Sequence, residues 1–208
     1  MKLVALISGR GSNLQAILDA GITVTAVISN NSDAAGLAMA QARGIPTRVI
    51  PHRDYADRAR FDRVVQDAID AYAPDLVVLA GYMRILTDDF VRHYAGRLLN
   101  IHPSLLPSFP GLHTHARALA EGVKIHGCTV HFVTPSLDRG PIVIQAAIRV
   151  QAGDTAETLQ KRVLAAEHRV YPQAVRWFLE GRLHIDADGK VNLSAATTSD
   201  QSVMMTGE

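Results

Sequence analysis

The sequence predicts an α/β fold: a Rossmann-like, mostly parallel central sheet with flanking helices, followed by an antiparallel strand pair in the C-terminal half. In the first half of the chain, short apolar runs alternate with amphipathic helical stretches, a pattern typical of parallel βαβ units. The first run, Leu3–Ile7, is continuously apolar and ends at a glycine turn, as expected of a strand buried on both faces. The second half changes to two strand-like runs and one long helical stretch.

Capping and breaking residues bound the elements of the first half. Ser12 or Asn13 is the expected N-cap of the first helix, Gly44 closes the second, and Pro74 ends the third. The predicted strands span Leu3–Ile7, Ile22–Ile28, Thr47–Ile50, Leu76–Ala80 and Leu98–Ile101. The predicted helices after the first span Asp33–Arg43, Asp54–Tyr72 and Thr87–Tyr94.

In the second half, Cys128–Val133 and Pro141–Val150 are predicted to pair as antiparallel strands, after a helix around Thr114–Glu121. Thr155–Glu180 is predicted as a long helix, capped by its own first residue or by the aspartate before it, and Leu183–Leu193 as a hairpin. No linker or repeat divides the chain, so we expect a single domain over residues 1–193 and a disordered tail over 194–208.

Composition limits the classes of function. The chain has 208 residues and a net charge of +1, so no strong field attracts nucleic acid or a membrane surface. Its apolar runs are shorter than the roughly 20 residues that a membrane helix needs, and Met1–Ile7 is too short for a signal peptide. Cys128 is the only cysteine, which suits a reducing compartment. We therefore expect a cytoplasmic protein without nucleic-acid or membrane partners.

The turn Ser8–Asn13 follows the first buried strand and opens a helix. Glycines let the backbone approach a ligand, and a helix N-terminus presents N–H groups to an anion, so a phosphate is a natural ligand. The turn matches neither a Walker A loop nor the usual dinucleotide fingerprint. A glycine turn here is also common for geometry alone, and both interpretations stay open.

Asn100 and His102 lie two residues apart at the end of a predicted strand, so their side chains point to the same side. An amide and an imidazole can together hold an oxygen that acquires negative charge, and histidine can move a proton near neutral pH. Taken alone, this pair is more typical of a structural turn. Asp138, in a Gly-Pro loop, is likewise a common turn residue, which gains importance only if folding brings it to His102.

Two further groups of residues have alternative interpretations. Met83, Arg84, Ile85 and Leu86 follow the central strand and are suited either to a flat heterocycle or to plain core packing. A metal site is conceivable from the nearby histidines, but no His-Glu-x-x-His or paired Cys-x-x-Cys motif is present, and we expect no metal. These histidines are His113, His115, His126 and His131.

From Leu3 to about Leu183 the chain resembles the folate-dependent phosphoribosylglycinamide formyltransferases, also called glycinamide ribonucleotide transformylases. The most specific stretch is Asn100-Ile101-His102-Pro103-Ser104-Leu105-Leu106-Pro107, followed by Pro110-Gly111-Leu112-His113-Thr114-His115. The other matching segments, in order, are Ile7–Ala16, Tyr72–Leu86, Gly127–Val133, Leu137–Pro141 and Glu167–Pro172.

The resemblance implies a formyltransferase fold with a nucleotide-binding half at about 1–101 and a folate and catalytic half at about 102–193. It implies transfer of a formyl group from 10-formyltetrahydrofolate to the amine of glycinamide ribonucleotide in purine synthesis, by a monomer or weak homodimer acting on small molecules. Asn100, His102 and Asp138 would be the catalytic residues. The implied nucleotide-binding residues are Gly11, Ser12, Asn13 and Glu167. The implied folate-binding residues are Arg58, Met83, Arg84, Ile85, Leu86, Asn100, His131 and Thr134.

These implied roles are chemically sensible. When the amine attacks the formyl carbon, the carbonyl oxygen gains negative charge, which the His102 imidazolium and the Asn100 amide stabilise. The Asp138 carboxylate favours the charged imidazole and can relay the proton that leaves the amine through water.

Three other functions remain as alternatives. Methionyl-tRNA formyltransferase has a similar catalytic domain but normally carries a tRNA-binding domain, and a net charge of +1 suits tRNA poorly. Formyltetrahydrofolate hydrolase uses water in place of the amine and usually has an extra N-terminal domain. A nucleotide-binding regulatory module without catalysis is disfavoured by the presence of Asn100, His102 and Asp138.

Overall fold

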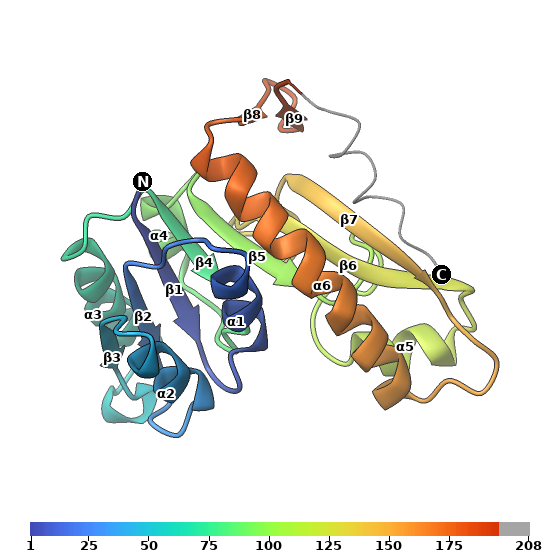
Figure 1. Ribbon diagram of the computed structural model, residues 1–208, viewed down its shortest axis with the longest axis horizontal. Coiled ribbons are helices and arrows are strands. Elements are labelled where there is room, and N and C mark those ends of the chain that lie inside the picture. The colour runs from blue at the N-terminus through green and yellow to red at the C-terminus, as the bar shows by residue number, and fades with distance from the viewer. Residues whose placement is uncertain (196–208) are drawn as a thin grey trace. The chain divides into compact units, whose positions relative to one another are not determined.

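The structure is a computed structural model that describes residues 1–195 of the chain. It confirms the predicted fold class: the strand order is β3-β2-β1-β4-β5-β6-β7, with a separate β8-β9 pair (Figure 1). The chain divides into two compact units, Met1–Asn100 and the part that begins at Ile101. Of the predicted tail, residues 196–208 lie outside the described part, and the single-domain assignment stays a prediction.

The first unit is a parallel sheet with helices between its strands. Its strands are β1 (Leu3–Ile7), β2 (Ala26–Ser29), β3 (Thr47–Val49), β4 (Leu76–Leu79) and β5 (Leu98–His102), the last of which ends two residues into the second unit. Its helices are α1 (Ser12–Asp19), α2 (Ala35–Ala42), the 3₁₀ turn η1 (His52–Asp54), α3 (Arg58–Asp70) and α4 (Asp88–His93). Adjacent strands of this unit pair in parallel throughout.

The central strands of this unit, β1 and β4, form the buried core around which its helices pack. Every residue of β1 is fully buried, and β4 is buried over its whole length. Register pairs Leu3 with Leu76 and Leu6 with Leu79, so branched apolar side chains fill both faces of the sheet. Their carboxyl ends therefore present the turns that follow, at Ser8 and at Gly81, on one edge of the sheet.

Three sequence predictions need correction. The N-cap of α1 is Gly11, in a left-handed conformation with φ 74°, and not Ser12 or Asn13. The second strand begins at Ala26 and not at Ile22, because Ile22 and Val24 are buried from a loop and not from a paired strand. The third helix begins at Arg58, because the Asp57 side chain accepts a hydrogen bond from the Arg60 N–H and so starts the helix there.

The second unit combines an antiparallel pair with a long helix. Its helices are α5 (Thr114–Ala120) and α6 (Ala156–Leu179), and its strands are β6 (Ile125–Phe132), β7 (Ile142–Arg149), β8 (Leu183–Ile185) and β9 (Val191–Leu193). β6 and β7 pair antiparallel as predicted, and α6 packs along both (Figure 1). Thr155 caps α6 through a capping box with Thr158, which confirms the predicted start of this helix.

Within residues 1–195, no helix is long and apolar enough to cross a membrane.

The register of the β6–β7 pair shifts between Val130 and His131. A bulge at this place changes the direction of the side chains that follow it, and His131 is one of the residues that the sequence had selected.

Candidate active site

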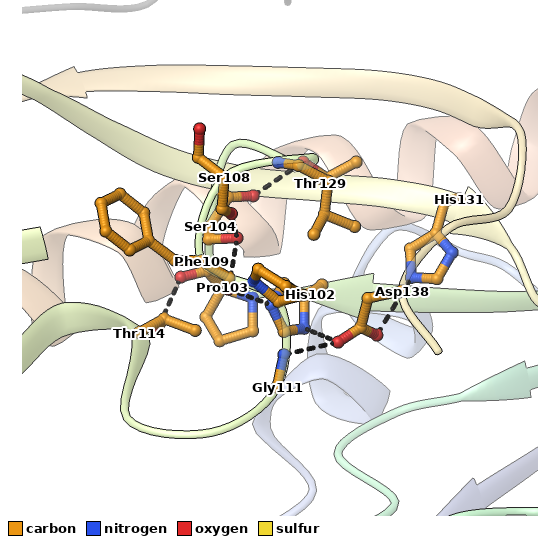
Figure 2. Close-up of polar contacts among 12 residues, drawn as sticks. His102, Pro103, Ser104, Ser108, Phe109, Gly111, Thr114, Thr129, His131 and Asp138 are labelled. Carbon is orange, nitrogen blue, oxygen red and sulfur yellow. Dashed lines mark hydrogen bonds and ion pairs between the residues drawn. The ribbon is translucent and has the colours of Figure 1, made fainter. Parts of the chain in front are cut away.

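A histidine and an aspartate from separate segments of the second unit meet in a buried cluster (Figure 2). His102 ends β5, and Asp138 lies in the loop between β6 and β7. The His102 Nδ1 atom lies 3.6 Å from Asp138 Oδ2, and each side chain is 8% exposed. That distance exceeds a hydrogen bond but brings the ring and the carboxylate into close electrostatic contact.

Backbone contacts fix the orientation of the His102 ring. Its Nε2 lies 3.0 Å from the carbonyl oxygen of Phe109, and because a carbonyl can only accept, Nε2 carries a proton. Ser104 Oγ also donates to the Phe109 carbonyl, at 3.1 Å, and to the Ser108 carbonyl, at 2.6 Å. Nδ1 is thereby left facing the carboxylate, and a second proton on the ring would point at Asp138.

Asp138 is held by the loop that follows the histidine. Its Oδ2 accepts the backbone N–H of Gly111 at 2.8 Å. Asp138 has φ 52°, a left-handed conformation that is uncommon outside glycine and is often found at functional sites. Gly140 closes the same turn so tightly that a Cβ there would lie 1.8 Å from the Phe132 carbonyl oxygen. The carboxylate therefore sits in a turn with little freedom to move.

His131 borders the other oxygen of the carboxylate. Its Nε2 lies 4.0 Å from Asp138 Oδ1, and its Nδ1 donates to the Phe132 carbonyl at 2.9 Å. Burial lowers the pKa of His131, although that hydrogen bond and the charge of Asp138 oppose the effect. We conclude that His131 contributes a largely neutral, buried ring to one side of the cluster.

A hydrogen-bonded threonine supports the turn after His102. Thr129 is completely buried on β6, and its Oγ1 donates to the Ser104 carbonyl at 2.7 Å. The same oxygen accepts the Leu106 N–H at 3.0 Å and a Gln145 side-chain N–H at 2.9 Å. Because all these groups are buried or half-buried, the turn is fixed to the β6–β7 pair.

The other catalytic and second-unit candidates have distinct positions. Asn100 is half-buried on β5, two residues before His102. Glu167 is buried on α6. Thr134 lies at the start of the β6–β7 loop, where its Oγ1 donates to the Ser136 carbonyl at 3.2 Å.

Gly11, Ser12 and Asn13 lie in the first unit, at the N-terminus of α1. A Cβ on Gly11 would lie 2.8 Å from the Cα of Gly36, so the two backbones touch and only glycine fits. The turn therefore places the N-terminus of α1 beside the start of α2.

The candidate folate residues of the first unit are mostly exposed. Arg58 is exposed at the start of α3. Met83 and Ile85 are 70% and 61% exposed, while Arg84 and Leu86 are half-buried. These values exclude simple core packing for Met83 and Ile85, which was the alternative interpretation of this segment.

Among residues 1–195, no group of three or more His, Cys, Asp or Glu side chains is placed to hold a metal ion. His115 and His126 lie together, with Nδ1 of one 3.2 Å from Nε2 of the other. Burial lowers the pKa of His126 to about 4 and lowers that of His115 as well. His113 begins α5 as its N-cap, with φ 57°.

Sequence reasoning missed the groups that orient the catalytic candidates. They are the Phe109 carbonyl and the Gly111 N–H, and the side chains of Ser104 and Thr129. The backbone groups have no signature of their own in the residue letters. Prolines and a Pro-Gly pair are typical of a constrained turn, but they do not indicate which of its atoms face the site.

The fold is that of a formyltransferase, and the chain belongs to the formyl transferase family, whose sequence model matches residues 1–175. Phosphoribosylglycinamide formyltransferase of Escherichia coli (strain K12) is 53% identical over 189 residues, which cover 88% of this chain and 89% of that protein. A solved structure of the phosphoribosylglycinamide formyltransferase from Coxiella burnetii, in complex with CHES, is 50% identical with a TM-score of 0.88, and 93% of each chain is covered.

Similarity extends to multifunctional proteins. The trifunctional purine biosynthetic protein adenosine-3 of Bos taurus is 45% identical over 196 residues, which cover 91% of this chain. The match accounts for only 19% of that protein's length. This chain therefore corresponds to about a fifth of the bovine protein.

Proposed function

We propose that this protein transfers a formyl group from 10-formyltetrahydrofolate to the amine of 5-phosphoribosylglycinamide, a step of purine biosynthesis. The observation that carries the proposal is the buried pair formed by His102 and Asp138, 3.6 Å apart and each held by backbone hydrogen bonds. The names of the relatives, which match most of the chain at high identity, support the choice of substrates.

In the proposed reaction the amine nitrogen attacks the formyl carbon, and the carbonyl oxygen takes up the negative charge. The His102 ring, in its charged form, and the Asn100 amide stabilise this oxygen. The amine loses a proton, which Asp138 accepts directly or through water. The bond from carbon to the folate nitrogen then breaks, that nitrogen takes a proton, and N-formyl product and tetrahydrofolate leave.

We assign the substrate ends to the first unit's turns and to α6. The backbone N–H groups at the start of α1, with Gly11, Ser12 and Asn13, are suited to the ribonucleotide phosphate. Glu167, buried on α6, is assigned to the ribose or glycinamide end. The N–H groups at the start of α1 would let a chain with a net charge of +1 bind an anionic phosphate locally.

For the folate we assign the exposed apolar side chains of the segment after β4, where Met83–Leu86 would line the pterin pocket. Arg58 would meet the acidic tail, and His131 and Thr134 would border the ring. No residue of this set is assigned to a metal. We further propose that the protein acts in the cytoplasm on small molecules, without nucleic acid.

One assay tests the function against its rivals. Purified protein is incubated with 10-formyltetrahydrofolate and, in turn, with glycinamide ribonucleotide, charged initiator tRNA, or water alone, and tetrahydrofolate release is followed. The proposal expects turnover only with the ribonucleotide. Formylation of the tRNA, or equal release with water alone, would replace it by a tRNA formyltransferase or a hydrolase, and no release in any arm would indicate a non-catalytic module.

A further inference from the structure

The segment that follows β4 is fixed at its beginning by Ser8, the first residue after β1. The Ser8 N–H donates to the Gly81 carbonyl at 3.1 Å. Ser8 Oγ accepts the Met83 N–H at 2.8 Å and donates to Asn30 Oδ1 at 2.6 Å. A single residue thus joins this segment to the ends of β1 and β2.

Asp62 fixes the other end of the same segment. It lies on α3, is 2% exposed, and its Oδ2 accepts the Thr87 N–H at 2.6 Å. Thr87 is the N-cap of α4, but its side chain makes no capping hydrogen bond. The place at which the segment turns into α4 is therefore defined by a carboxylate from another helix, through a charge-assisted hydrogen bond.

The carboxylate is also close to the side chains that the segment turns inward. Asp62 Oδ1, Tyr82 Oη and Arg84 Nε are buried atoms without a hydrogen-bond partner among the described residues. Burial raises the pKa of Asp62, and Thr87, Arg58 and Arg84 oppose the effect. The Arg84 guanidinium lies 5.4 Å above the Phe61 ring, one residue from Asp62. A buried carboxylate is costly to keep unless it is hydrogen-bonded, and Asp62 is hydrogen-bonded to the segment, at Thr87.

Between its two fixed ends, the segment holds Met83 and Ile85 outward at 70% and 61% exposure. Large apolar side chains presented to solvent on a backbone fixed at both ends are typical of a preformed ligand surface. We propose that Asp62 is a positioning residue for the folate co-substrate, which holds Met83–Leu86 in the conformation that binds it. This inference rests on the proposed function and adds to it a residue that does not touch the folate.

Steady-state kinetics separates positioning from general support. In Asp62→Ala the Thr87 N–H loses its acceptor, and we expect the KM for 10-formyltetrahydrofolate to rise about 10-fold, while kcat and the KM for the ribonucleotide stay within about 2-fold. Asp62→Asn keeps an oxygen for the Thr87 N–H and should recover most of the loss. The matched control is Asp67→Asn, an exposed carboxylate on the same helix, which should behave as wild type.

Hydrogen exchange gives a readout that does not depend on activity. The amides of residues 82–91 should exchange faster in Asp62→Ala than in wild type, with strands β1 and β4 unchanged. An unchanged folate KM in Asp62→Ala would overturn the inference. So would an equal rise in the KM values for both substrates, accompanied by a lower Tm, in Asp62→Ala and Asp62→Asn alike. If wild-type protein transfers no formyl group, the proposed function is wrong. If the amides of this segment exchange equally fast in Asp62→Ala and in wild type, Asp62 does not hold the segment in place.

Discussion

The Nδ1 atom of His102 faces the Oδ2 atom of Asp138 at 3.6 Å, although the two residues come from different elements of the second unit. At this distance the two side chains are not hydrogen-bonded to each other, so other groups hold each of them in place. The Phe109 carbonyl holds the ring, and the Gly111 N–H holds the carboxylate. Both anchoring groups belong to one turn, so the pair depends on the conformation of that turn.

The close packing at Gly140 gives a first prediction. In Gly140→Ala the added methyl would overlap the Phe132 carbonyl, 1.8 Å away, so the turn that carries Asp138 must shift. We expect a loss of at least about 2 kcal/mol in the free energy of unfolding, measured by urea denaturation, together with a large fall in kcat. Gly9→Ala is the control, because its methyl meets no atom within 4 Å, and it should unfold as wild type does.

Thr129 gives a second prediction. Thr129→Val keeps the shape of the side chain but leaves the buried Ser104 carbonyl and Leu106 N–H without this partner. The expected cost is about 2–4 kcal/mol in the free energy of unfolding, measured by urea denaturation. Thr47→Val is the comparison, since the Thr47 hydroxyl accepts a hydrogen bond from the exposed Gln41 side chain. Equal costs in the two variants would mean that the buried contacts of Thr129 do not stabilise the turn.

His126 gives a prediction about pH. Burial, and then the neighbouring His115, lower its pKa from 6.5 to about 4, so the unfolded chain takes up the proton more readily than the folded protein. Neutral His126 therefore contributes roughly 2–4 kcal/mol to the free energy of unfolding above pH 6.5. This contribution is lost as the pH falls from 6.5 towards 4.

Thermal unfolding between pH 7 and pH 4 tests this effect. The Tm of wild type should fall steeply over this range, and His126→Gln should flatten the dependence. His184→Gln, at an exposed histidine on β8, should leave it as steep as in wild type. A His126→Gln curve parallel to that of wild type would show that His126 titrates normally in the folded protein.

Local patterns in the sequence identified the elements whose signals lie within a few residues. The apolar runs of β1 and β4 are buried strands because each side chain meets an apolar face, and Thr155 caps α6 with the hydroxyl that the pattern selects. The start of α1 was mistaken because its N-cap, Gly11, is chosen by backbone conformation and by contact with Gly36 and not by a capping side chain.

The site was less accessible to sequence reasoning. Asn100 and His102 share a strand, so their common side follows from the pleat. The approach of Asp138 does not follow from spacing, because it depends on a left-handed turn and on backbone donors and acceptors. The catalytic role of Asp138 was predicted from the resemblance to a known family. The role proposed for Asp62 could not be predicted, because in the sequence it is one aspartate in an amphipathic helix.

The central claim is that the charge of Asp138 acts on His102 during formyl transfer. Asp138→Asn tests it directly, because the amide oxygen can still accept the Gly111 N–H while the negative charge is removed. With both substrates saturating, we predict that kcat falls by about 10²–10³-fold or more with an unchanged Tm, while Asp188→Asn, at an exposed turn, keeps full activity. A kcat for Asp138→Asn within about 3-fold of wild type would contradict the account.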